Sequence, residues 1–164
     1  MPTVEIEVRR FSVVSSRRFE EVVSSLTATI GHPDIVAFRS VLSAARNVAD
    51  LHKVVGQAIG SSGLMEFIRF DLGEILRKEQ GGQEPRILRL VIGNPLIMKE
   101  MVKTVPDAGS YAPVTILVDE RADGVHLSYD LMASHIAPYG SHVALAVAKD
   151  LDTKIESLLK TAAG

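Results

Sequence analysis

The turn Gly93-Asn94-Pro95 is the first place in the chain where residue types and spacing suggest chemistry. It follows an apolar run that ends at Ile92 and precedes a helical pattern that begins at Leu96. Asn is a favoured helix N-cap, and Pro fits the first helical position. Free N–H groups at a helix start attract phosphate or carboxylate. Pro95, however, removes one N–H, and no P-loop Lys or Ser/Thr follows. The turn therefore predicts either an anion site or a purely structural strand-to-helix connection.

The segment from His126 to Asp130 places His126, Ser128 and Asp130 on one face of a predicted strand. Side chains two apart on a strand lie side by side, which does not build a catalytic triad. A serine nucleophile at position 128 would also need a base and an oxyanion hole, and the sequence shows neither. The polar strand end is thus a candidate cleft wall rather than a recognisable hydrolase site.

Carboxylates and histidines are the remaining side chains that could act in catalysis or in ligand binding. Asp119, Glu120 and Asp130 flank a predicted hairpin, and paired carboxylates can divide acid and base roles. The histidines are His32, His52, His126, His135 and His142. None has the i, i+4 spacing of a helical zinc pair, so no metal site is predicted. His126 and His135 can nevertheless converge with Asp71 or Glu120 in space, and Tyr129 offers a ring and a hydroxyl to a ligand cleft.

Five apolar strand patterns alternate with helical patterns along the chain. Val4, Ile6 and Val8 alternate with charged residues, and this phase slips at Arg9-Arg10, which indicates a bulge or a strand break. The other predicted strands are 64–70, 86–92, 113–120 and 125–130, the last two joined through an Asp-Gly turn. The run 86–92 is almost wholly apolar, so we expect it to be central and buried on both faces. Helical patterns lie near 19–30, 34–45, 49–59, 72–79, 96–102 and 141–159.

Bulk composition excludes several classes of function. The 164 residues suit one domain, and a formal charge of −2 argues against a nucleic-acid footprint. The absence of cysteine excludes disulfides, thiol nucleophiles and Cys-ligated metals. The sequence shows no basic-then-apolar leader and no apolar window of the ~18 residues that span a membrane. We therefore expect a cytoplasmic protein that contacts neither membrane nor nucleic acid.

An ordered set of short motifs carries a family resemblance. The set comprises Ile92-Gly-Asn-Pro95, Met98, Pro106, Ala112-Pro-Val114, Asp119-Glu120, Gly124-Val125, Leu127-Ser-Tyr-Asp130 and the helix Ala148–Glu156. In this order the motifs resemble the bacterial domain-of-unknown-function family 302. The resemblance implies a compact, dimeric α+β fold with no established activity. The chain departs from the family in two places: Leu72 stands where members tend to carry histidine after Asp71, and residues 32–63 form a longer, more helical connection.

These observations predict a single α+β domain over residues 1–164, with a helical insertion at about 32–63. About five strands form a mixed or antiparallel sheet packed with four to five helices. The predicted function is a small-ligand-binding or interaction module that forms a homodimer and uses no cofactor. A small anionic ligand is expected near Asn94. The predicted ligand-binding residues are Asp71, Asn94, Glu120, His126, Tyr129 and His135.

An acid–base enzyme, a hydrolase or isomerase of a small metabolite, is the alternative. It requires Glu120 or Asp130 to lie within hydrogen-bond reach of His126 or His135 in a water-poor cleft. A plain structural dimer is the third hypothesis. It gains weight if the apolar helix faces between Ile35 and Ile59 exceed what one sheet can cover.

Overall fold

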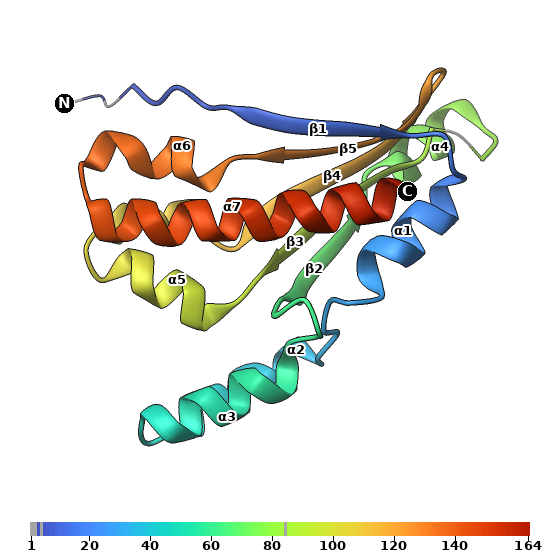
Figure 1. Cartoon of the computed structure of the whole chain (residues 1–164). Helices are drawn as coiled ribbons and strands as arrows, with labels where there is room; N and C mark the ends of the chain where they lie inside the picture. Colours follow the sequence, from blue (N-terminus) through green and yellow to red (C-terminus); the bar gives the residue numbers. More distant parts are fainter. Residues whose placement is uncertain (1–2, 4, 84) are drawn as a thin grey trace.

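The strands form one antiparallel sheet in the order β1-β5-β4-β3-β2 (Figure 1). The structure is a computed structural model and describes residues 3, 5–83 and 85–164. The strands are β1 (Arg10–Ser15), β2 (Met65–Asp71), β3 (Ile87–Gly93), β4 (Val114–Arg121) and β5 (Gly124–Asp130). The Asp-Gly turn joins β4 to β5 with Arg121 opposite Gly124, as predicted. The single α+β domain with a five-stranded sheet is therefore confirmed, and every strand pairing is antiparallel.

Helices cover one face of this sheet (Figure 1). The long helix α7 (His142–Ala163) packs against the sheet and is flanked by α1 (Phe19–Thr27), α5 (Pro95–Val102) and α6 (Met132–Ile136). Beneath them lie alternate strand residues such as Leu90, Ile116 and Leu127, all fully buried. Removal of this apolar surface from water is the main favourable term in folding. It also fixes the strand register, because a one-residue slip would turn these side chains outward.

The other helices lie away from this layer. The helices α2 (Ile35–Ala44) and α3 (Val48–Ala58) project together from the body, and α4 (Gly73–Gln80) follows β2 (Figure 1). Short 3-10 turns occupy Pro106–Ser110 and Ala137–Tyr139. The described residues thus contain seven α-helices. The single-turn helix α6 is the one that no helical pattern predicted, because five residues are too few to show a period.

Two glycines hold the α2–α3 pair to the body. Gly31 N and Gly60 N both donate to Leu64 O, at 2.8 and 2.9 Å. A Cβ on Gly31 would lie 2.0 Å from Ala58 O, and one on Gly60 would lie 2.2 Å from Thr29 O. The segment that precedes α2 therefore crosses the segment that follows α3 at Gly31 and Gly60, and neither position has space for a side chain.

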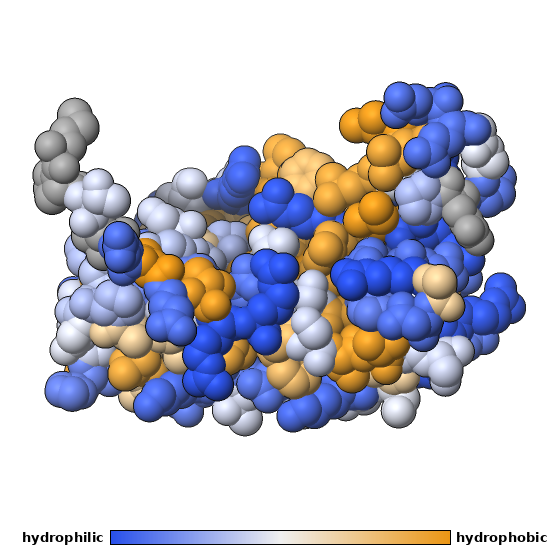
Figure 2. All heavy atoms as spheres, turned by 90° about the horizontal axis from the view of Figure 1, so that it is seen from above, coloured by the Kyte–Doolittle hydropathy of each residue, from blue (hydrophilic) through white to orange (hydrophobic). Residues whose placement is uncertain are grey.

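The opposite face of the sheet is largely open to solvent. It presents Val14, Ile68 and Phe70, with exposed fractions of 47%, 45% and 41%. Half-buried Val91 and Leu117 lie between them on β3 and β4. In the view from above, apolar side chains gather toward the end of the molecule that carries α4 (upper right in Figure 2). The helical layer therefore leaves this face of the sheet largely uncovered.

Two strand predictions need correction. Residues 5–9 are not in a strand, and Val4 lies outside the described residues; β1 begins at Arg10, because its partner β5 ends at Asp130 and the chain then turns toward α6. The strand β3 is an interior strand, paired with β4 and β2, but it is not buried on both faces. Arg89 and Val91 face the open side, so its apolar run reflects the core mainly on one face.

Candidate functional site

The six predicted site residues lie at the two ends of the sheet. Asp71 and Glu120 stand at the ends of β2 and β4, and His126 lies near them, opposite Asp119. The strands β3 and β5 are each antiparallel to β4, so both terminate at the opposite end of the sheet. Asn94 and Tyr129 lie at that end. The Gly93-Asn94-Pro95 turn and the Asp130 end of β5 therefore lie at the same end of the sheet, but the six residues do not form one cluster.

At the first end, Asp71, Glu120 and His126 each have a separate partner. Asp71 Oδ2 accepts a 2.6 Å bond from Arg77, which lowers the pKa of Asp71, and Asp71 Oδ1 accepts from Glu74 N at the start of α4. His126 Nε2 lies 2.8 Å from Asp123 Oδ1. These contacts stabilise local turns and leave the three side chains apart from one another.

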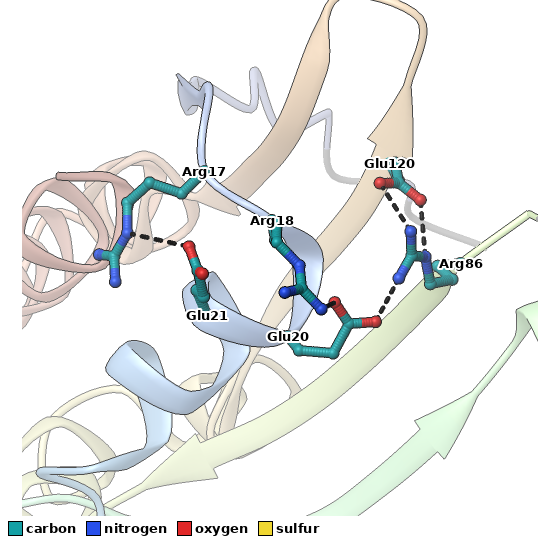
Figure 3. A network of polar contacts seen from close by, with 6 residues as sticks. All are labelled: Arg17, Arg18, Glu20, Glu21, Arg86 and Glu120. Atoms are coloured by element: carbon teal, nitrogen blue, oxygen red, sulfur yellow. Dashed lines mark hydrogen bonds and ion pairs between the residues drawn. The ribbon is translucent and has the colours of Figure 1, made fainter.

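Glu120 belongs to an ion-pair network that ties α1 to the sheet (Figure 3). Arg86 donates to both Glu120 oxygens, at 2.7 and 3.0 Å, and also to Glu20 of α1. The hydrogen bond with Glu120 is the main cause of the raised pKa of Arg86. Arg18 extends the network to Glu20 at 3.9 Å, and the neighbouring pair Arg17–Glu21 spans 4.0 Å (Figure 3). The network has a structural role that accounts for the conformation of Glu120.

At the second end, the side chain of Asn94 holds the turn together. Its Oδ1 accepts from Leu96 N at 2.8 Å, which is the predicted N-cap of α5. Its Nδ2 donates to Gly63 O at 2.9 Å and so fixes the loop before β2. Both polar atoms of the amide are therefore used within the fold, which supports the structural interpretation of Gly93-Asn94-Pro95.

Tyr129 faces the helical layer and binds Asp152, a residue that the sequence reasoning missed. Its hydroxyl donates to Asp152 Oδ1 at 2.7 Å, and both side chains are buried. Asp152 also accepts from Met132 N and Ala133 N, at 2.7 and 2.9 Å, which anchors the start of α6. A signal was available: Asp152 interrupts the apolar face of the final helix between Leu151 and Ile155. A carboxylate in that position requires buried partners.

A cleft of about 360 Å³ opens on the bare face, where β5 turns into α6. We call it the sheet-face cleft, and its polar and aromatic lining includes Arg10, Arg89, Tyr111, Ser128, Asp130 and His135, together with Ser110, Thr115 and Tyr129. Three strands, β1, β3 and β5, supply Arg10, Arg89, Ser128 and Asp130. Tyr111 and His135 come from the segments beyond the strand ends. Chemistry-bearing side chains thus converge here from five separate segments.

The arginines and Asp130 give this cleft its electrostatic character. Arg10 binds Asp130 through two bonds, at 2.6 and 2.9 Å, and this lowers the pKa of Asp130. Arg89 lies over the Phe70 ring, 5.9 Å from its centroid, and makes a long 3.4 Å contact with Thr115 Oγ1. Within the described part of the chain no carboxylate pairs with Arg89, so the cleft carries an excess positive charge.

The aromatic wall of the cleft is a stacked pair. The rings of Tyr111 and His135 are 4.6 Å apart at 18°. The Tyr111 hydroxyl also bonds to that of Tyr139 at 2.9 Å, and this bond raises the pKa of Tyr139 to about 12. The wall is thus fixed by contacts on two sides and places an aromatic pair among the residues that line the cleft.

The geometry that an acid–base enzyme would need is not formed. Among the residues that the structure describes, no hydrogen bond joins His126 or His135 to Glu120 or Asp130. Both carboxylates are bound by arginines instead. The described residues also contain no group of three or more His, Asp or Glu side chains that could hold a metal ion. The contact between a carboxylate and a histidine that the acid–base hypothesis requires is therefore not formed by these four residues.

The fold and the cleft define a single-domain α+β protein with a five-stranded antiparallel sheet that is covered by helices on one face. The chain belongs to the DUF302 family, a domain of unknown function, whose profile matches residues 39–162. The crystal structure of an uncharacterised conserved DUF302 protein from Bacillus stearothermophilus has a similar fold, with a TM-score of 0.66 at 12% identity, over 93% of this chain and 97% of that one. No functionally curated protein matches the sequence. The resemblance inferred from the motifs is therefore confirmed.

None of the helices among the described residues is long and apolar enough to cross a membrane.

Proposed function

We propose that this protein is a cytoplasmic, homodimeric module that binds a small anionic ligand in the sheet-face cleft. The observation that supports this most directly is Arg89, a guanidinium with no carboxylate partner among the described residues, which lines a cleft beside a second arginine. Arginine presents a planar fork of donors that matches carboxylate and phosphate. A ligand that accepts hydrogen bonds from Arg89 would balance the excess charge.

The wall opposite the arginines narrows the class of ligand. Tyr111 and His135 place an aromatic pair in the lining, so an anion with a planar or aromatic part fits better than a bare inorganic ion. The volume of about 360 Å³ lies within the range of small-ligand sites. Ser128 adds a hydroxyl that can donate to the ligand or accept from it. Small aromatic carboxylates are therefore the favoured ligands.

Of the six residues predicted from the sequence, His135 and Tyr129 line this cleft. We propose His135 as a contact residue and Tyr129 as part of the lining. Asn94 supports the same end of the sheet through the turn that it caps. Asp71, Glu120 and His126 lie at the other end and are assigned no part in this site.

The homodimer is proposed on the bare sheet face. Ile68 and Phe70 of the edge strand β2 are 45% and 41% exposed there, and a second copy would remove them from water. A two-fold interface uses the same patch on both subunits, so one apolar surface is sufficient.

Methionine-methyl NMR of the intact protein tests ligand binding without any variant. Met132 lines the sheet-face cleft, whereas Met65 is fully buried beneath α2 and α3. Titration with benzoate and related aromatic carboxylates should shift the Met132 methyl signal and leave that of Met65 in place. A panel of such acids that moves neither signal would contradict the proposed site.

A further inference from the structure

A second and chemically different cavity lies where α2 meets the sheet and α5. It has a volume of about 480 Å³, and we call it the α2 cavity. Its walls are formed by Phe38 and Leu42 of α2, Phe67 and Val91 of the sheet, and Met98 of α5. It is separated from the sheet-face cleft by the start of β4, where Val114 lines both spaces.

The lining of the α2 cavity is almost entirely apolar. Of the described residues that line it, Arg39 and Asn94 alone carry polar side chains. Both polar atoms of Asn94 already have partners in the fold. Met98 and Met101 lie on one wall, and methionine adapts readily to irregular apolar ligands. An apolar molecule in this cavity would be removed from water, which is energetically favourable.

Arg39 supplies a single positive charge to the cavity wall. Arg39 lies four residues after Ile35 and three before Leu42, so the three side chains share one face of α2. The nearby carboxylate of Asp34 accepts from Ala37 N as the cap of α2. Within the described residues, no ion pair engages Arg39, and its side chain is exposed. An apolar chamber with one cation on its wall complements an acid with an aliphatic chain.

We propose that the α2 cavity binds a medium-chain aliphatic acid, with the chain between α2 and β3 and the carboxylate at Arg39. The site is distinct from the sheet-face cleft, because its lining is mostly apolar and includes Arg39 of α2 in place of Arg10 and Arg89. The helix α2 then has a role beyond packing: it supplies the outer wall and the charged group of a second binding site.

Decanoate and decanol are the probes, measured by calorimetry on the full chain. Wild-type protein should bind both, and Arg39→Gln should weaken decanoate about two- to fivefold, the range of an exposed ion pair, while leaving decanol unchanged. Arg46→Gln, the same charge change in the turn between α2 and α3, is the matched control and should alter neither affinity. Equal loss in both variants, or no binding of either probe to the wild type, would overturn the proposal.

A filling variant tests the location of the chain. Leu42→Trp places a large ring in the cavity and should abolish binding of both probes, whereas Val41→Trp, at a 52% exposed position of the same helix, should not. In the unmodified protein, decanoate should shift the methyl signals of Met98 and Met101 but not that of Met132. A shift of Met132 alone would overturn the proposal even if Leu42→Trp fails to fold.

Discussion

The hydroxyl of Tyr129 and the carboxylate of Asp152 are joined by a 2.7 Å hydrogen bond inside the protein. The pair connects β5 to α7, and Asp152 receives two further bonds from Met132 N and Ala133 N. Burial is the main cause that raises the pKa of both groups. The pair therefore positions α6, which carries His135 of the sheet-face cleft. Tyr129 thus affects the site indirectly, through the helix that supplies His135.

Removal of the Tyr129 hydroxyl should destabilise the fold. Tyr129→Phe takes one donor from a buried carboxylate, so we expect the free energy of unfolding to fall by about 1–3 kcal/mol in urea denaturation. Tyr139→Phe is the matched control, because its hydroxyl bonds to Tyr111 near the surface, and its effect should be smaller. An equal or larger loss for Tyr139→Phe would contradict the central structural role of the buried pair.

Asp152 should give stability a definite pH dependence. Its pKa is raised in the folded state above the ordinary value of about 3.9, so the folded protein binds the proton more tightly than the unfolded chain. The contribution of Asp152 to the free energy of unfolding is greatest below its pKa in the unfolded chain. This contribution is lost as the pH rises through its pKa in the folded protein. The unfolding free energy of wild type minus that of Asp152→Asn should therefore decrease as pH rises. Urea denaturation over a pH series measures this difference, and an increase with pH would refute the assignment.

The crossing at Gly60 should not tolerate a side chain. Gly60→Ala places a Cβ 2.2 Å from Thr29 O, so backbone must move, and we expect a loss of about 3 kcal/mol in thermal or urea unfolding. A Cβ on Gly56 of α3 would meet no other atom within 4 Å, and Gly56→Ala should stabilise the helix by about 0.5–1 kcal/mol. The free energy of unfolding should therefore change in opposite directions for these two glycines, which are four residues apart. An unchanged stability of Gly60→Ala would contradict the close crossing of the two segments at Gly60.

The proposed homodimer should depend on the bare sheet face. Phe70→Glu places a charge in the apolar patch and should convert the dimer to a monomer in light scattering coupled to size exclusion. Ile75→Glu on α4, at a 73% exposed position outside the sheet, is the control and should leave the mass unchanged. A wild-type protein that is monomeric at all concentrations would remove the proposal.

Much of the fold could be predicted from local patterns. The Asp123-Gly124 turn predicts the β4–β5 hairpin, and Asn94-Pro95 predicts the start of α5, because each depends only on neighbouring residues. The strand order could not be predicted in the same way. Placing Arg10 of β1 beside Asp130 of β5 requires the pairing of distant segments, which no local pattern shows.

The candidate site was predicted less completely than the fold. His135 was identified as a polar residue at a strand end, and it does line the cleft. Arg10 and Arg89 were missed, because an arginine on a half-exposed strand is ordinarily a solvated charge. Their importance depends on strands that are far apart in sequence and adjacent in space. The ion pair of Glu120 could not be predicted from local sequence either, since its partner Arg86 is 34 positions away.

The most direct test of the proposed function is the affinity for small aromatic carboxylates of the wild type and of two arginine variants. Calorimetry should show that Arg89→Gln weakens binding about tenfold, the scale of a hydrogen bond to a charged group. Arg39→Gln, which removes the same charge from the α2 cavity, should bind these ligands as the wild type does. Unchanged affinity in Arg89→Gln, or an equal loss in both variants, would contradict a specific anion site in the sheet-face cleft.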